Sequence, residues 1–172
     1  MTDPARLLIH AHNHLGSSKG APNQTDLRRA ISSAYYAVFH HFLRSVSDHL
    51  IGSSPTHRKR PEYRLVYRSL QHASMSEVCE AVRKPSLSDR YERACGLASF
   101  SHGIKGCATA FVDLQRMRHA ADYDPVRRFT KAQASAVIDT AAYATMAFDA
   151  APDAEKRLFL HLLVFLVFKV RD

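Results

Sequence analysis

The most regular hydrophobic pattern in the chain lies between Gln24 and Leu50, where apolar residues recur every three or four positions. They are Leu27, Ile31, Ala34, Tyr35, Val38, Phe39, Phe42, Val46 and Leu50. A stripe of this length predicts a long central helix with one buried face. Four polar or aromatic residues share the opposite side, where they either face solvent or line a site. They are Arg29, Ser33, Tyr36 and His40.

Weaker patterns of the same period predict helices before and after the central one. They cover residues 4–16, 62–82 with a break near Ser74 or Ser76, 103–122, 130–149 and a last segment from 153 onward. Thr130 and Gln133 have the spacing of a capping box. Val137, Ala141, Ala144 and Phe148 would form the buried stripe of the helix that this box begins.

No segment shows the alternating pattern of a strand, an internal repeat or a low-complexity composition. The 172 residues have 46% hydrophobic content, which suits one domain with a single core. The sequence therefore predicts one all-α domain over residues 1–172, an antiparallel helical bundle.

The composition indicates which partners and which kinds of site to expect. Lys and Arg total 24 against 16 Asp and Glu, a formal charge of +8 that favours RNA or another polyanion. The three cysteines lack CxxC spacing, and His10 and His14 have no acidic or Cys ligand near them in sequence, so we expect no disulfide framework, no metal site and no cofactor.

The two ends of the sequence suggest a location in the cytoplasm. The first residues lack the basic and apolar regions of a secretory signal. The apolar run 158–170 is shorter than the ~20 residues of a membrane span and is interrupted by His161. We interpret this run as a buried or dimer-covered helix, with no membrane association.

Charged residues gather where the predicted helix 103–122 ends. Phe111, Leu114 and Arg118 share one helical face, and Asp122 lies one turn further along that face. Tyr123 follows, just before a proline that stops the helix. The cluster is either an ion-paired helix end or a polar site at the end of the bundle.

The densest positive charge lies in a segment whose composition is that of a loop. Arg58, Lys59 and Arg60 follow a stretch rich in glycine, serine and proline. These three residues either contact phosphates of a nucleic acid or form a solvated loop without a partner.

Two segments together resemble proteins of the HEPN family. Residues 26–40 are similar to the first long helix of that family, and residues 114–125 to its later signature, in the same order and at a similar separation. The resemblance implies a four-helix core, here with additional helices, and a homodimer that brings both signatures to one cleft. Many members are metal-independent ribonucleases of toxin or defence systems, often paired with a nucleotidyltransferase-like antitoxin.

The family signature is an arginine, a polar residue, three variable residues and a histidine. Here Arg118 and His119 match its first two positions, and Tyr123 occupies the histidine position. A subset of the family carries this Ala-Asp-Tyr version. By analogy, Arg118 would hold the phosphate, His119 would act as base, and Tyr123 would act as acid or hold the substrate. Asp122 and Tyr36 would support them.

Two functions are consistent with these features. The first is an RNA-directed protein, possibly a metal-independent endoribonuclease, in which Arg58, Lys59 and Arg60 guide the RNA. The second is a non-catalytic interaction or nucleotide-binding module in which Arg118, Asp122 and Tyr123 are structural. A helical DNA-binding regulator fits less well, because no helix-turn-helix spacing is present.

Overall fold

The fold is all-α, as the sequence predicts. The computed structural model describes residues 2–16 and 22–165, and no strand occurs within these two ranges. In chain order the described helices are α1 (Pro4–Gly16), α2 (Gln24–Ile51), α3 (Pro55–Lys59), α4 (Pro61–Ser69), α5 (His72–Val82), α6 (Asp89–Cys95), α7 (His102–Tyr123), α8 (Lys131–Asp149) and α9 (Asp153–Phe165).

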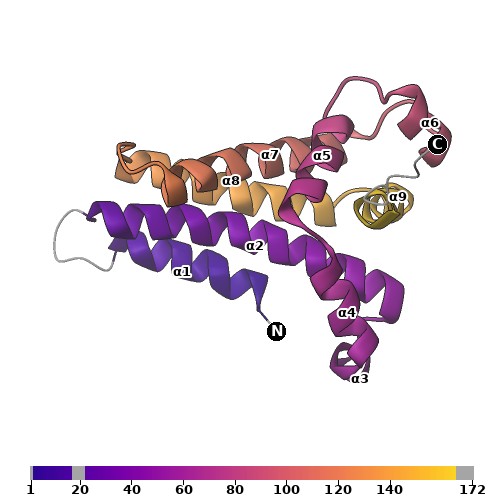
Figure 1. Ribbon diagram of the computed structural model, residues 1–172, viewed down its shortest axis with the longest axis horizontal. Coiled ribbons are helices and arrows are strands. Elements are labelled where there is room, and N and C mark those ends of the chain that lie inside the picture. Colours follow the sequence, from indigo (N-terminus) through magenta and orange to yellow (C-terminus); the bar gives the residue numbers. More distant parts are fainter. Residues whose placement is uncertain (1, 17–21, 166–172) are drawn as a thin grey trace.

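Four of these helices, α1, α2, α7 and α8, lie side by side and alternate in direction (Figure 1). The carboxyl end of α1, the amino end of α2 and the connection between α7 and α8 lie at the same end of this bundle, and α5 packs against α7. The short helices α3 and α4 lie beside the carboxyl-terminal half of α2, and α9 crosses the far end of the bundle. The end of α7 therefore lies beside the amino-terminal half of α2.

The core is built on the apolar stripe of α2. Every residue of the predicted stripe is buried except Leu50, which is 38% exposed because it lies in the last turn, beyond the packed helices. Phe42 lies at the centre, with its ring centroid 5.7 Å from Phe111, 5.3 Å from Phe148 and 5.4 Å from Phe159. One side chain of α2 thus joins α7, α8 and α9.

The helix boundaries confirm most of the predicted signals. The Thr130–Gln133 capping box is formed, and the predicted stripe of α8 is buried. In α9, Phe159, Leu160, Leu162 and Leu163 are buried, as predicted, whereas Phe165 at its end is 57% exposed. The remaining residues of the predicted run, 166–170, lie outside the described part of the chain. None of the described helices is long and apolar enough to cross a membrane.

Two predictions about the middle of the chain were wrong. The break placed near Ser74 or Ser76 occurs at Leu70 and Gln71, whose extended backbone separates α4 from α5 and buries the Leu70 side chain. The basic segment is not a loop throughout, because residues 55–59 form α3, which the Ser54 side chain caps by accepting a hydrogen bond from the backbone N–H of His57. Arg60 is the extended residue between α3 and α4.

The guanidinium of Arg28 closes the carboxyl end of α7. It donates hydrogen bonds to the carbonyl oxygens of Ala121 at 2.6 Å and Asp124 at 2.8 Å, and also to that of Arg127. The last carbonyls of a helix lack intrahelical partners and carry partial negative charge, so a cation there is stabilising. Arg28 thereby holds residues 118–123 against α2.

Replacing Arg28 by alanine is expected to lower the free energy of unfolding by about 2 kcal/mol, because charge-assisted hydrogen bonds are lost and water replaces only some of them. The melting temperature should fall by roughly 6 °C for a chain of this size. Urea unfolding would measure the change. The exposed neighbour Arg29 provides the matched control, and equal effects of Arg28→Ala and Arg29→Ala would rule out this role.

Candidate functional site at the end of α7

The Arg118 side chain is held from several directions at the end of α7. Its Nη2 donates hydrogen bonds to the hydroxyl oxygens of Tyr36 at 3.0 Å and Tyr123 at 3.3 Å. Its guanidinium carbon also lies 5.5 Å from the ring centroid of Tyr36 and 5.1 Å from that of Tyr123. The cation is thus positioned by two aromatic rings as well as by two hydrogen bonds.

An ion pair completes this arrangement. Asp122 Oδ2 lies 2.6 Å from Arg118 Nε, although the Nε–H is not directed well enough to form a hydrogen bond. The other carboxylate oxygen of Asp122 accepts a hydrogen bond from Ser32 on α2. With the two side chains only 14% and 27% exposed, solvent screens this pair less than a surface pair. It ties the end of α7 to α2.

One nitrogen of Arg118 is left for a ligand. Nη1 makes no hydrogen bond with the described residues, and it is not among their fully buried polar atoms. A guanidinium nitrogen with free N–H groups, beside tyrosine hydroxyls, is a donor set for a phosphate oxygen. Tyr123 is 65% exposed, so this side of the cluster is open to solvent.

The structure brings a histidine to this cluster that sequence reasoning missed. His72, the first residue of α5, stacks on Phe39 with a centroid separation of 3.9 Å and lies edge-on to Tyr36 at 5.9 Å. Burial lowers the pKa of His72, and the positive charges of Arg118 and His119 lower it further. His72 is therefore neutral at pH 7 and within electrostatic range of both residues.

A buried tyrosine determines which nitrogen of His72 carries the proton. Tyr35 is fully buried, and burial raises the pKa of its hydroxyl above the ordinary value, so the hydroxyl stays protonated. It lies 2.6 Å from His72 Nδ1, its only hydrogen-bond partner among the described residues. A buried hydroxyl needs an acceptor, so it donates to Nδ1 and leaves the proton of neutral His72 on Nε2. In this form His72 is a hydrogen-bond donor and not a base.

His119 lies beside the cluster and outside its interior. It is exposed, its ring centroid is 5.3 Å from that of Tyr123, and it lines a shallow groove between α5 and α7. Glu77 and Glu80 line the same groove. Of the predicted site residues, Arg118, Tyr36, Asp122 and Tyr123 therefore form one contact cluster, and His119 adjoins it through Tyr123.

The partly buried histidines make stability depend on pH. Burial lowers the pKa of His40 and His72, and the positive charge of Arg118 lowers that of His72 further. As a result, the unfolded chain binds protons at a higher pH than the folded chain. The contribution of these histidines to the free energy of unfolding is therefore complete at any pH above their unfolded pKa. Their contribution is lost as the pH falls from there through the folded pKa.

We expect the melting temperature to be lower at pH 5 than at pH 7, and differential scanning fluorimetry across this range would measure it. Replacing His72 by glutamine should reduce the difference between the two pH values, whereas His10→Gln, on the exposed side of α1, should leave it unchanged. A melting temperature that rises on acidification would contradict the prediction.

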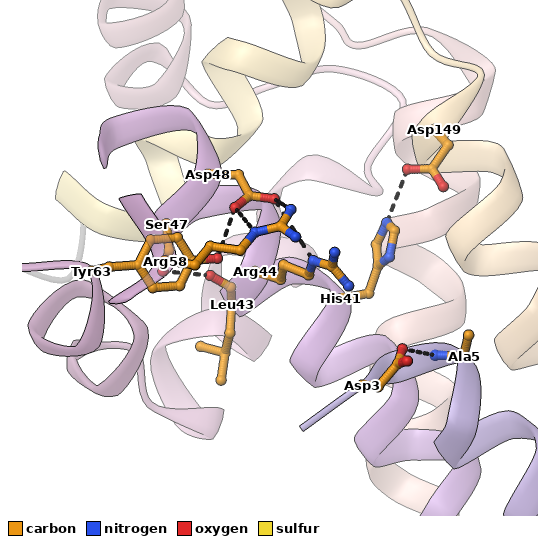
Figure 2. Close-up of polar contacts among 10 residues, drawn as sticks. All are labelled: Asp3, Ala5, His41, Leu43, Arg44, Ser47, Asp48, Arg58, Tyr63 and Asp149. Atoms are coloured by element: carbon orange, nitrogen blue, oxygen red, sulfur yellow. Dashed lines mark hydrogen bonds and ion pairs between the residues drawn. The ribbon is translucent and has the colours of Figure 1, made fainter. Parts of the chain in front are cut away.

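The basic segment does not join this cluster as a unit. Arg58 donates hydrogen bonds from Nε and Nη2 to the two oxygens of Asp48, at 2.9 and 2.6 Å, as Figure 2 shows. Its charge is thus paired within the fold. Lys59 and Arg60 are exposed and form no ion pair with the described residues, so they are available to an external anion. That any of the three binds nucleic acid stays a prediction.

The described residues contain no group of three or more His, Cys, Asp or Glu arranged to hold a metal ion. Cys79, Cys95 and Cys107 are free thiols, and burial raises the pKa of each one above its ordinary value. Such thiols are poor nucleophiles and poor ligands in this form. The side chains gathered at the end of α7 are arginine, aspartate, tyrosine and histidine.

Comparisons with protein-family models, with curated proteins and with solved structures found no match to this chain. The resemblance to the HEPN family stays a prediction that rests on residues 26–40 and 114–125.

Proposed function

We propose that the protein is an RNA-directed HEPN-like protein that cleaves RNA without a metal ion, with Arg118 as its phosphate-binding residue. The observation that carries the proposal is the open donor of Arg118. The guanidinium is fixed by Tyr36 and Tyr123 while Nη1 remains unpaired among the described residues. The formal charge of +8 supports a polyanionic substrate.

The reaction that fits these side chains is attack of a ribose 2′-oxygen on the adjacent phosphodiester. The 2′-oxygen forms a bond to phosphorus, and the bond from phosphorus to the 5′-oxygen breaks. His119 takes the proton of the 2′-hydroxyl, and the Tyr123 hydroxyl gives a proton to the leaving 5′-oxygen. Arg118 stabilises the charge that develops on the phosphorane oxygens.

His72 supports this site as a positioning residue. Its neutral ring lies edge-on to Tyr36, the tyrosine that orients Arg118. Because Tyr35 occupies Nδ1, the ring cannot turn without breaking a buried hydrogen bond. His72 thus helps to fix the Tyr36 ring and, through it, the guanidinium.

The ion pair between Arg118 and Asp122 favours a second candidate function, a non-catalytic interaction or nucleotide-binding module. In that case the pair and the Ser32 hydrogen bond serve only to fix the end of α7 on α2. The two functions differ in one respect that can be measured. A structural Arg118 contributes to stability alone, whereas a phosphate-binding Arg118 contributes to RNA affinity and cleavage.

The partners belong to the same proposal. We infer a homodimer that brings two Arg118 sites to one cleft, RNA as substrate, and a nucleotidyltransferase-like antitoxin as the binding partner in the cytoplasm. These follow from the resemblance of residues 114–125 to the HEPN signature. Analytical ultracentrifugation of the purified chain would test the dimer.

The test of the catalytic proposal is incubation of the purified protein with a labelled single-stranded RNA in the presence of EDTA. Cleavage should produce 2′,3′-cyclic phosphate ends, and a DNA of the same sequence should stay intact because it lacks the 2′-hydroxyl. Loss of cleavage in EDTA, or cleavage of the DNA, would overturn the metal-free mechanism. Intact RNA under all conditions would favour the non-catalytic candidate.

A further inference from the structure

A row of arginines runs along the outer side of α4. Arg64 and Arg68 are spaced four residues apart on α4, so they lie one above the other on one helical face, about 6 Å apart, and Arg60 is the extended residue that precedes the helix. All three are exposed, and none forms an ion pair with a described residue. A line of unpaired cations at regular intervals is suited to a linear polyanion.

Arg64 and Arg68 border a groove. Lys59, Arg64 and Arg68 line a cavity of about 390 Å³ together with Arg58 and the rings of Tyr63 and Tyr67. No acidic side chain is among the described residues that line it. Tyr63 is fully buried and forms the floor, whereas Tyr67 is half-buried and presents part of its ring to the groove. Positive rims around an aromatic wall characterise single-strand binding surfaces.

A continuous row of side chains connects this groove to Arg118. The Tyr67 hydroxyl lies 2.8 Å from His40 Nδ1, and the two rings are stacked at a centroid separation of 5.9 Å. His40 in turn stacks on Tyr36 at 6.2 Å, and Tyr36 contacts Arg118. The groove and the end of α7 are therefore consecutive parts of one polar and aromatic surface along α2.

We propose that the α4 groove binds a single-stranded RNA segment that flanks the nucleotide at Arg118, with its phosphates on Lys59, Arg64 and Arg68 and one base against Tyr67. This inference rests on the proposed function. A single strand can place a splayed base into a narrow groove, whereas a duplex keeps its bases paired inside. Arg58 stabilises the groove through Asp48 and takes no part in phosphate binding.

The experiment compares Arg64→Ala/Arg68→Ala with the control Arg90→Ala/Arg93→Ala, which removes two exposed arginines from α6 and causes the same change in net charge. Fluorescence anisotropy with a labelled single-stranded RNA of about 12 nucleotides would measure binding at several salt concentrations. The α4 variant should bind about tenfold more weakly, and its slope of log K against log salt should be smaller by about 1.4, two phosphate contacts. Circular dichroism would verify that both variants fold.

The outcomes separate this inference from the proposed function. Equal affinities of the two variants for RNA would overturn the proposal that the α4 groove binds RNA, and would leave the proposal of cleavage at Arg118 unaffected. An equal loss for an RNA duplex would overturn the assignment to a single strand, as would tight binding of an acidic peptide at the same site with no RNA binding. RNA binding that depends on α4 without any cleavage would retain the groove and overturn the catalytic proposal.

Discussion

Replacing Arg118 by alanine is expected to lower the rate of RNA cleavage about 100-fold, the usual effect of removing one preorganised donor from a developing anion. The guanidinium is positioned before substrate arrives, by hydrogen bonds to Tyr36 and Tyr123 and by the ion pair with Asp122. The substitution removes both the positive charge and the oriented N–H donors of the guanidinium. Single-turnover cleavage of a labelled RNA would measure the rate constant.

Arg116→Ala is the matched control, because Arg116 lies two residues earlier on α7, is 69% exposed and has Asp113, at 3.4 Å, as its one ion-pair partner among the described residues. Arg118→Lys should recover only part of the rate, since lysine keeps the charge and lacks the planar fork. The non-catalytic function predicts the reverse pattern. In that case Arg118→Ala lowers the melting temperature and leaves RNA binding and cleavage equal to those of Arg116→Ala.

Replacing Asp48 by alanine is expected to lower the free energy of unfolding by about 3 kcal/mol, because its removal leaves one buried hydroxyl without an acceptor and two partly buried guanidinium groups without their counter-charge. Asp48 accepts hydrogen bonds from Arg58 and, at 2.8 Å, from the fully buried hydroxyl of Tyr63 (Figure 2). Arg44 Nε lies 3.8 Å from the same carboxylate. Alanine would leave two cations near each other and a buried hydroxyl without its acceptor.

The pKa of Asp48 indicates over which pH range this contribution acts. Burial acts to raise that pKa, but the hydrogen bonds and charges of Arg58, Tyr63 and Arg44 outweigh burial and bring it below the ordinary value. A carboxyl whose folded pKa is depressed stabilises the fold fully above its unfolded pKa, and the contribution is lost as the pH falls through the folded pKa. The effect of Asp48→Ala should therefore be complete at pH 7 and absent in strong acid.

Urea unfolding at pH 7 would measure the change, and the melting temperature should fall by roughly 9 °C. Asp139→Ala on α8 is the control, because Asp139 is exposed and has no ion pair with a described residue. It should change the free energy of unfolding by less than about 0.5 kcal/mol. A similarly small effect of Asp48→Ala would mean that the cluster behaves as an ordinary surface ion pair.

The helices themselves follow closely from local sequence signals. The stripe of α2, the capping box of α8 and the proline after α7 each depend on residues within a few positions of one another. Such signals are visible in a linear pattern because helix formation is governed by local spacing and by the partners of the end groups. The break between α4 and α5 was misplaced. It lies at Leu70, which is extended and has its side chain buried in the tertiary core, and this burial is not visible in the local sequence.

The candidate site followed from the sequence only in part. Arg118 and Asp122 are four residues apart and therefore share one face of a helix, so their ion pair could be predicted. The roles of His72 and Arg28 could not, because their partners lie 37 or more residues away in sequence. To predict the role of His72, one would have to know that α5 begins beside Phe39.

By itself the sequence determined the all-α class, the long α2 helix and the concentration of charge at the end of α7, because periodicity and capping are local properties of the chain. Only the tertiary structure decided which charges are paired. In the described part of the chain, Arg58 is paired with Asp48, Arg64 and Arg68 on α4 have no ion-pair partner, and His72 lies beside Tyr36. The physical reason is that the desolvation and the pairing of a charged side chain depend on its neighbours in space. Those neighbours are set by how the other helices pack around α2.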